Sequence, residues 1–207
     1  MRKRIDPDQV GAGSFYRLIT SLVVPRPIAW VATTSTEGID NLAPHSFFTC
    51  ACVDPPVLQF TSVGAKDTLR NCLETGGMTI SVCPEPMFER VNATATDFPA
   101  SEGEFGAVGV EAEPSERVRP PRVAGSPAAF ECELAGTKSF GNSTVIFCAV
   151  LLAAVEESVL ADDGLADIEA LAPLARLGRN EWATIGEVKR IDRIPYSDWN
   201  ESTTTKG

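Results

Sequence analysis

The sequence predicts a mainly β fold, an antiparallel barrel with short helical inserts. Runs rich in β-branched and aromatic residues, each bounded by Pro or Gly, outnumber the helical segments. These runs do not alternate regularly with helices, as a parallel βαβ sheet requires, and no repeat of 20–50 residues is present. An antiparallel barrel is therefore favoured over a doubly wound sheet.

The first 93 residues are predicted to hold three helices and four strands. Apolar residues at helical spacing mark the first helix, which a proline at position 25 ends. A turn at residues 36–38 joins the first two strands in a hairpin, and Gly76 stops the second helix. The helices are expected at residues 14–24, 66–75 and 85–93, and the strands at 28–35, 41–52, 57–62 and 78–82.

The second half begins with a long irregular excursion over residues 94–124, with a helical turn near Phe105 and a short strand near Val118. Loops of this length are typical of lids and interface arms. Beyond it we expect strands at residues 128–138, 143–155 and 181–185, a helix at 165–174, and a loose polar tail from Ser197. The chain is expected to form a single domain over residues 1–207, with its core at about 14–186.

The composition indicates a globular protein with an acidic surface. The chain has 207 residues, 43% of them hydrophobic, and a formal net charge of −10. Such a charge repels phosphate backbones and argues against non-specific nucleic-acid binding. Neither a secretory signal nor an apolar run of membrane-spanning length is present, so we expect a cytoplasmic location and no membrane association.

The six cysteines do not match a zinc-binding pattern. Cys50 and Cys52 form a C-x-C pair, and His45 is the only histidine. On an alternating strand both thiols would point to one face, most simply the core. We therefore favour buried structural cysteines over a metal or redox site, and we expect no metal.

The usual catalytic motifs are absent from the sequence. It contains no G-x-S-x-G, P-loop, H-E-x-x-H or Rossmann fingerprint. His45 alone would have to support acid–base catalysis, and a lone histidine is more often a packing or hydrogen-bonding residue. No catalytic side chain is predicted.

Polar residues instead gather where the expected strands end and the second helix begins. Backbone N–H groups at a helix start, next to Lys66 and several hydroxyls, suit a phosphate group. A plain capped helix with a solvated lysine explains the same residues, and the two interpretations stay open at this level. The polar group comprises Thr33, Thr34, Ser35, Ser46, Thr49, Ser62, Lys66, Asp67 and Thr68.

Four segments in order resemble the flavin reductase-like, FMN-binding split-barrel proteins. The longest runs from VPRPIAWVATTS through NLAPHSFFTC to KDTLRNCLETGG at residues 24–77. VNATATDFP at 91–99, VRPPRVAGSPAAFECEL at 118–134 and LAPLARLG at 171–178 continue it. The resemblance spans roughly residues 14–186, most of the chain.

This resemblance implies a Greek-key split β-barrel, usually a homodimer, with FMN in a groove near the dimer interface. The flavin ring would be bonded largely by backbone groups near Ser46, Phe47 and Phe48, and the phosphate would lie near Ser62 and Lys66. The cofactor-binding residues implied in this way are Ala32, Thr33, Thr34, Ser35, Pro44, His45, Ser46, Phe47, Phe48, Thr49, Ser62, Lys66, Asp67 and Thr68.

The implied function is that of an FMN-dependent oxidoreductase, most simply an NAD(P)H:flavin reductase. Hydride would pass from the nicotinamide to bound FMN, and then to a flavin, a small-molecule acceptor or a partner oxygenase. His45 replaces an aromatic residue common in the family and is a candidate substrate contact. The alternatives are a non-enzymatic FMN-binding or electron-carrying protein, and a split barrel holding haem or a deazaflavin.

Overall fold

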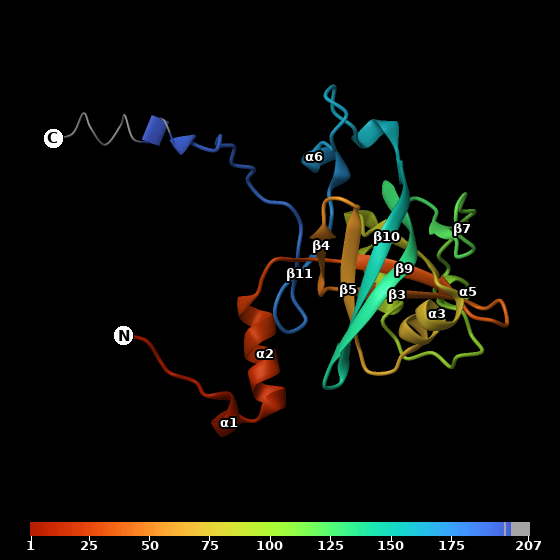
Figure 1. Cartoon of the computed structure of the whole chain (residues 1–207), viewed down its shortest axis with the longest axis horizontal. Coiled ribbons are helices and arrows are strands. Elements are labelled where there is room, and N and C mark those ends of the chain that lie inside the picture. The colour runs from red at the N-terminus through yellow and green to blue at the C-terminus, as the bar shows by residue number, and fades with distance from the viewer. Residues whose placement is uncertain (197, 200–207) are drawn as a thin grey trace.

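The computed structural model describes residues 1–196 and 198–199, so the tail expected to be loose from Ser197 lies almost entirely outside the described residues. A curled antiparallel sheet of seven strands forms the body of the mainly β fold (Figure 1). Its order is β3-β2-β6-β9-β10-β5-β4. The strands are β2 (Ala29–Thr34), β3 (Asp40–His45), β4 (Phe48–Cys52), β5 (Val57–Val63), β6 (Gly77–Val82), β9 (Ala128–Phe140) and β10 (Ser143–Val155).

Short helices and two small sheets surround this body. The helices are α1 (Pro7–Val10), α2 (Ala12–Leu22), α3 (Asp67–Thr75), α4 (Phe88–Ala93), α5 (Glu104–Val108) and α6 (Ile168–Leu171), with 3-10 turns at Glu85–Met87 and Glu157–Val159. The small sheets are β1 (Arg26–Pro27) with β11 (Ala175–Arg176) and β12 (Trp182–Ala183), and β7 (Ala112–Glu113) with β8 (Arg122–Val123).

The single strand expected over residues 41–52 is wrong, because the chain there forms two strands at opposite edges of the sheet. β3 pairs with β2 and β4 pairs with β5, so Ser46 and Phe47 carry the chain from one edge to the other. Pro44, which cannot donate to a ladder, is tolerated because β3 is an edge strand. The Thr61 N–H donates to the Phe47 carbonyl over 3.0 Å and fixes this crossing against β5.

β2 lies between two hydrophobic clusters and is buried along its whole length. Its side chains alternate between them: Trp30 packs with Leu42 and Phe105, and Val31 packs in the cluster of Phe60. The Trp30 indole also donates to Thr94 Oγ1 over 2.9 Å, which anchors the chain just after α4.

The expectation that Cys50 and Cys52 are buried is wrong, since both are exposed. They lie on the edge strand β4, where a register shift places Cys50 opposite Leu58 and Cys52 opposite Val57. Every residue of β4 after Phe48 is exposed, including those before the shift, so the described residues cover neither face of this edge strand. The other four cysteines are buried, and no metal-binding group of His, Cys, Asp and Glu occurs among the residues that the structure describes.

Several predicted boundaries are corrected. α3 begins at Asp67 with Lys66 at the N-cap, and neither Asp67 nor Thr68 caps it by a side chain, whereas Gly76 ends it in the left-handed conformation, φ 75°, as expected. The helix expected at 165–174 is only α6, because the left-handed Ala172 ends it before a proline. The strand expected at 181–185 is only β12.

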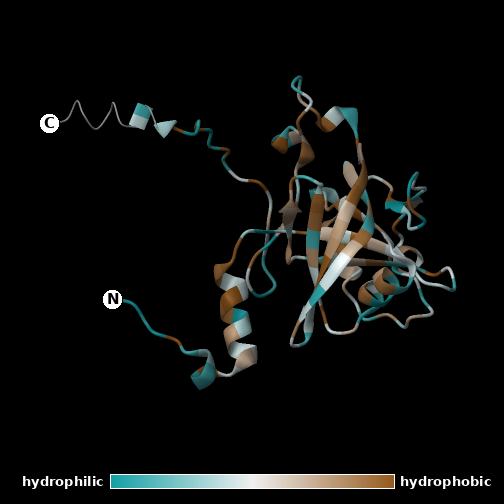
Figure 2. Ribbon diagram, viewed as in Figure 1, coloured by the Kyte–Doolittle hydropathy of each residue, from teal (hydrophilic) through white to brown (hydrophobic). Residues whose placement is uncertain are grey.

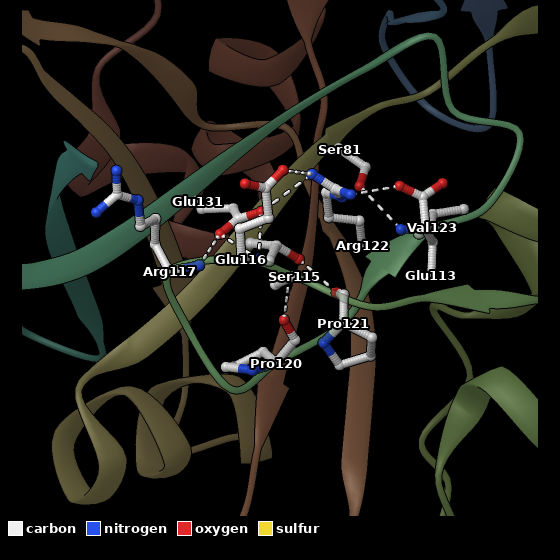
Figure 3. A network of polar contacts seen from close by, with 11 residues as sticks. Ser81, Glu113, Ser115, Glu116, Arg117, Pro120, Pro121, Arg122, Val123 and Glu131 are labelled. Atoms are coloured by element: carbon white, nitrogen blue, oxygen red, sulfur yellow. Dashed lines mark hydrogen bonds and ion pairs between the residues drawn. The ribbon is translucent and has the colours of Figure 1, made fainter. Parts of the chain in front are cut away.

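A buried carboxylate ties the long excursion over residues 94–124 to the sheet (Figure 3). Glu131 on β9 is fully buried and accepts hydrogen bonds from the backbone N–H groups of Glu116 and Arg117. The Arg122 guanidinium donates to Glu131 over 3.1 Å and also pairs with Glu113. The helical turn expected near Phe105 is confirmed as α5, but the strand expected near Val118 is replaced by β7 and β8 on either side.

The segment with α1 and α2 and the described part of the C-terminal segment project from the barrel (Figure 1), and both contain residues of hydrophobic character (Figure 2). α2 has no buried residue, and its Leu22 is 70% exposed. Ile191 near the C-terminus is 91% exposed. Among the helices of the described residues, none has the length and apolar character to cross a membrane.

Candidate flavin site

A cavity of about 380 Å³ opens where the two edges of the sheet approach each other. The end of β3, the Ser46–Phe47 crossing, the end of β5 and the start of α3 form its walls, and the loop at 94–98 closes one side. Its size is in the range of small-molecule sites. Of the residues predicted to bind a cofactor, the structure brings together on this wall Pro44, His45, Ser46, Phe47, Ser62, Lys66, Asp67 and Thr68.

The remaining predicted site residues lie outside the cavity lining. Ala32, Thr33, Thr34 and Ser35 are buried at the end of β2, where they hold neighbouring segments. Thr33 Oγ1 accepts a hydrogen bond from Asn71 in α3, and Thr34 donates to Asp40 across the hairpin. Phe48 packs against the core and Thr49 is exposed.

The start of α3 supplies the donors for an anion. No side chain caps this nine-residue helix, so the N–H groups of its first turn are not satisfied by a capping side chain. Ser62, Lys66 and Thr68 line the cavity beside it. Lys66 Nζ lies 2.7 Å from the Asp97 carboxylate, and this hydrogen bond lowers the pKa of Asp97. The donor set fits a phosphate group, which favours the anion interpretation of the sequence pattern over a plain capped helix.

His45 lies in a hydrogen-bonded chain at the cavity wall. Its Nδ1 is 3.3 Å from the Thr61 carbonyl, which can only accept, so Nδ1 carries the proton. Its Nε2 therefore accepts from Thr68 Oγ1 over 3.4 Å, and Thr68 Oγ1 in turn accepts from the Asn41 amide over 3.0 Å. Burial lowers the pKa of His45 to about 4, and Lys66 acts in the same direction. The imidazole is therefore neutral at neutral pH and suited to positioning rather than to proton donation.

Arg26 of β1 does not line the cavity but contacts Ser46 and Phe47, which join the two edges of the sheet. Its Nε donates to Ser46 Oγ over 3.3 Å, and its guanidinium carbon lies 6.0 Å from the Phe47 ring centre. Phe47 in turn meets Tyr16 of α2 edge-on at 6.3 Å. Two elements outside the barrel, α2 and β1, thus contact the residues that join its edges.

Sequence reasoning missed part of the wall. Tyr16 and Asn41 line the cavity, as does Glu104, which accepts the Leu42 N–H over 2.8 Å and whose pKa is raised by burial. The loop over residues 94–98 also lines it. That loop falls within the VNATATDFP segment, so the resemblance marked it as a family feature without indicating its place.

Comparison with known proteins identifies the family. The model of the flavin reductase like domain matches residues 21–171. The chain belongs to the flavin reductase-like family. Its fold is accordingly the split barrel, with the opening between β3 and β4 described above.

Three solved structures resemble this family member over nearly their whole length. Nitrilotriacetate monooxygenase component B from Bacillus cereus has 27% identity and a TM-score of 0.88, with 92% of this chain and 99% of that one covered. The 2-nitrobenzoate 2-nitroreductase NbaA of Pseudomonas fluorescens has 28% identity and a TM-score of 0.86, covering 93% and 96%. Flavoredoxin of Desulfovibrio vulgaris has 25% identity and a TM-score of 0.79, covering 92% and 97%.

Proposed function

We propose that this flavin reductase-like protein is an FMN-dependent oxidoreductase, most simply an NAD(P)H:flavin reductase. The observation that carries the proposal is the cavity itself, which has a phosphate-type donor set at the start of α3 and a polar strand crossing in its wall. Membership of the flavin reductase-like family supports a flavin as its occupant. A single cluster of phosphate donors favours FMN.

Different residues would bind the phosphate and the flavin ring of FMN. Lys66, Thr68 and the first turn of α3 would hold the phosphate, and Ser46 and Phe47 would lie along the ring. The neutral His45 would keep Thr68 oriented. Bound FMN would supply the hydride chemistry, accepting hydride from a nicotinamide and delivering electrons to an acceptor. The protein would bind and orient the reactants, and no acid–base pair is required.

The similar structures favour different acceptors. A component of a monooxygenase suggests that this protein delivers reduced flavin to a partner oxygenase. A nitroreductase suggests direct reduction of a small organic molecule. Flavoredoxin supports the second candidate function, a non-enzymatic electron carrier that binds FMN without turning over a nicotinamide.

We further propose a homodimer and a cytoplasmic location. The exposed apolar residues of α2 are not covered by any part of the chain that the structure describes, and a second copy would bury them. Six free cysteines are typical of a compartment that keeps thiols reduced. Light scattering tests the dimer, and a monomer at micromolar concentration would contradict it.

The decisive experiment is a visible absorption spectrum of the protein with FMN, taken anaerobically before and after NADH or NADPH is added. We expect bound flavin bands that bleach with one of the two nicotinamides. Bands that persist with both would favour the carrier. A protein that binds no added FMN would overturn both functions and return attention to haem or a deazaflavin.

A further inference from the structure

We propose that Arg26 is a positioning residue that orients the Ser46 hydroxyl as a hydrogen-bond donor to the flavin ring, and that this donor increases the affinity of the site for reduced FMN more than for oxidised FMN. The inference rests on the proposed FMN site. It adds a residue outside the cavity lining, and it predicts which redox state of the ligand this donor favours.

Arg26 is a buried cation without a carboxylate partner. It is 7% exposed, and none of the ion pairs among the described residues includes it. Backbone carbonyls replace the carboxylate: its Nη1 donates to those of Thr20 and Val23, and its Nη2 donates to that of Leu177 over 2.7 Å. The first two belong to the C-terminal end of α2, where the helix dipole favours a cation.

The remaining donor of the guanidinium, Nε, donates to Ser46 Oγ over 3.3 Å. Because Arg26 can only donate, Ser46 Oγ must accept this bond with a lone pair. The hydroxyl proton has no acceptor among the described residues, and Ser46 lines the cavity. The proton is therefore available to a ligand there, and the guanidinium behind it makes the hydroxyl a stronger donor.

The position of Ser46 is fixed by its neighbours. The Phe47 carbonyl is held by the Thr61 N–H, and the Phe47 ring packs against Tyr16 and under Arg26. A donor held in place needs no rearrangement when charge appears in front of it, which is the condition for preferring one charge state over another.

Reduction of the ligand provides that charge. FMN takes up two electrons and one proton, delivered together as hydride by the nicotinamide, and the reduced ring carries one more negative charge than the oxidised ring. A donor polarised by a buried cation stabilises this charge more than it stabilises the neutral ring. The protein should thus raise the reduction potential of bound FMN relative to a site without this donor.

The test measures the anaerobic dissociation constants of oxidised FMN and of dithionite-reduced FMN, together with the midpoint potential of the complex. For Ser46→Ala we expect about a tenfold greater loss of affinity for reduced than for oxidised FMN, equivalent to about 30 mV lower potential for a two-electron couple. Ser46→Thr, which keeps the hydroxyl, should restore most of the difference. Ser158→Ala, an exposed serine outside the cavity, is the matched control and should change nothing.

Arg26→Gln keeps donors but removes the charge. It should lower the potential in the same direction, and combining it with Ser46→Ala should lower it no further, since both act through one hydroxyl. Because Arg26 joins several segments, the serine variants decide the matter if this variant does not fold. Equal losses of affinity for both redox states, or an unchanged potential in Ser46→Ala, would overturn the proposal while leaving the FMN site intact. Failure of the unmodified protein to bind FMN would overturn the proposed function itself.

Discussion

Replacing Lys66 by alanine tests the assignment of the phosphate end of the cavity. In the structure the Lys66 ammonium lies 2.7 Å from Asp97, and its side chain is 56% exposed. An ion pair this exposed is weakened by solvent, so a phosphate can displace Asp97 at small cost. A hydrogen bond between charged groups contributes about 1.5–3 kcal/mol. Lys66→Ala should therefore weaken FMN binding by about 1–3 kcal/mol, roughly 5- to 150-fold in dissociation constant.

The assay is flavin fluorescence quenching with two ligands, FMN and riboflavin, which lacks the phosphate. The loss should appear with FMN and be nearly absent with riboflavin, because only FMN carries the group that Lys66 contacts. Lys138→Ala, on the β9–β10 hairpin outside the cavity, is the control for net charge. Unchanged FMN affinity, or an equal loss for riboflavin, would show that the phosphate lies elsewhere.

Three further results are expected. Glu131→Ala leaves two backbone N–H donors without an acceptor and removes one carboxylate partner of Arg122, which keeps Glu113. Urea titration should therefore show a free energy of unfolding lower by about 1–3 kcal/mol, whereas Glu133→Ala at an exposed site of the same strand should have little effect. Burial lowers the pKa of His45 to about 4, so as the pH falls the unfolded chain protonates this histidine before the folded protein does. The free energy of unfolding should therefore fall as the pH drops from about 6.5 towards 4. In thermal melts, His45→Gln should show a smaller loss of stability over this pH range. Ellman's reagent should modify two thiols in the native protein, Cys50 and Cys52, and the other four only after unfolding.

The local sequence was sufficient to predict elements whose bounds depend on a single segment of the chain. β10 occupies Ser143–Val155, the range predicted from a long β-branched and apolar run. Gly76 ends α3 because the left-handed position there favours glycine. The anion site around Lys66 stays a prediction, made from a helix start, a lysine and hydroxyls that are contiguous or nearly so in the sequence.

The features that the sequence did not predict depend on contacts between segments that are distant in the sequence. Residues 41–52 alternate without an obvious break, and only the pairing of β3 and β4 with different neighbours separates them at Ser46. The wall residues Asn41 and Glu104 are far apart in sequence and meet because α5 packs on β3. The exposure of Cys50 and Cys52 goes with the place of β4 at the edge of the sheet, which local propensity does not encode.

The two residues that link β3 to β4, Ser46 and Phe47, limit how far apart the two edges of the barrel can lie. With two residues between the strand ends, the chain makes three Cα–Cα steps and reaches at most about 11 Å, so the two edges cannot drift further apart without breaking a strand. Insertions into this two-residue link should therefore be the rarest change that a functional descendant can carry, because each added residue would let the two edges of the barrel separate further.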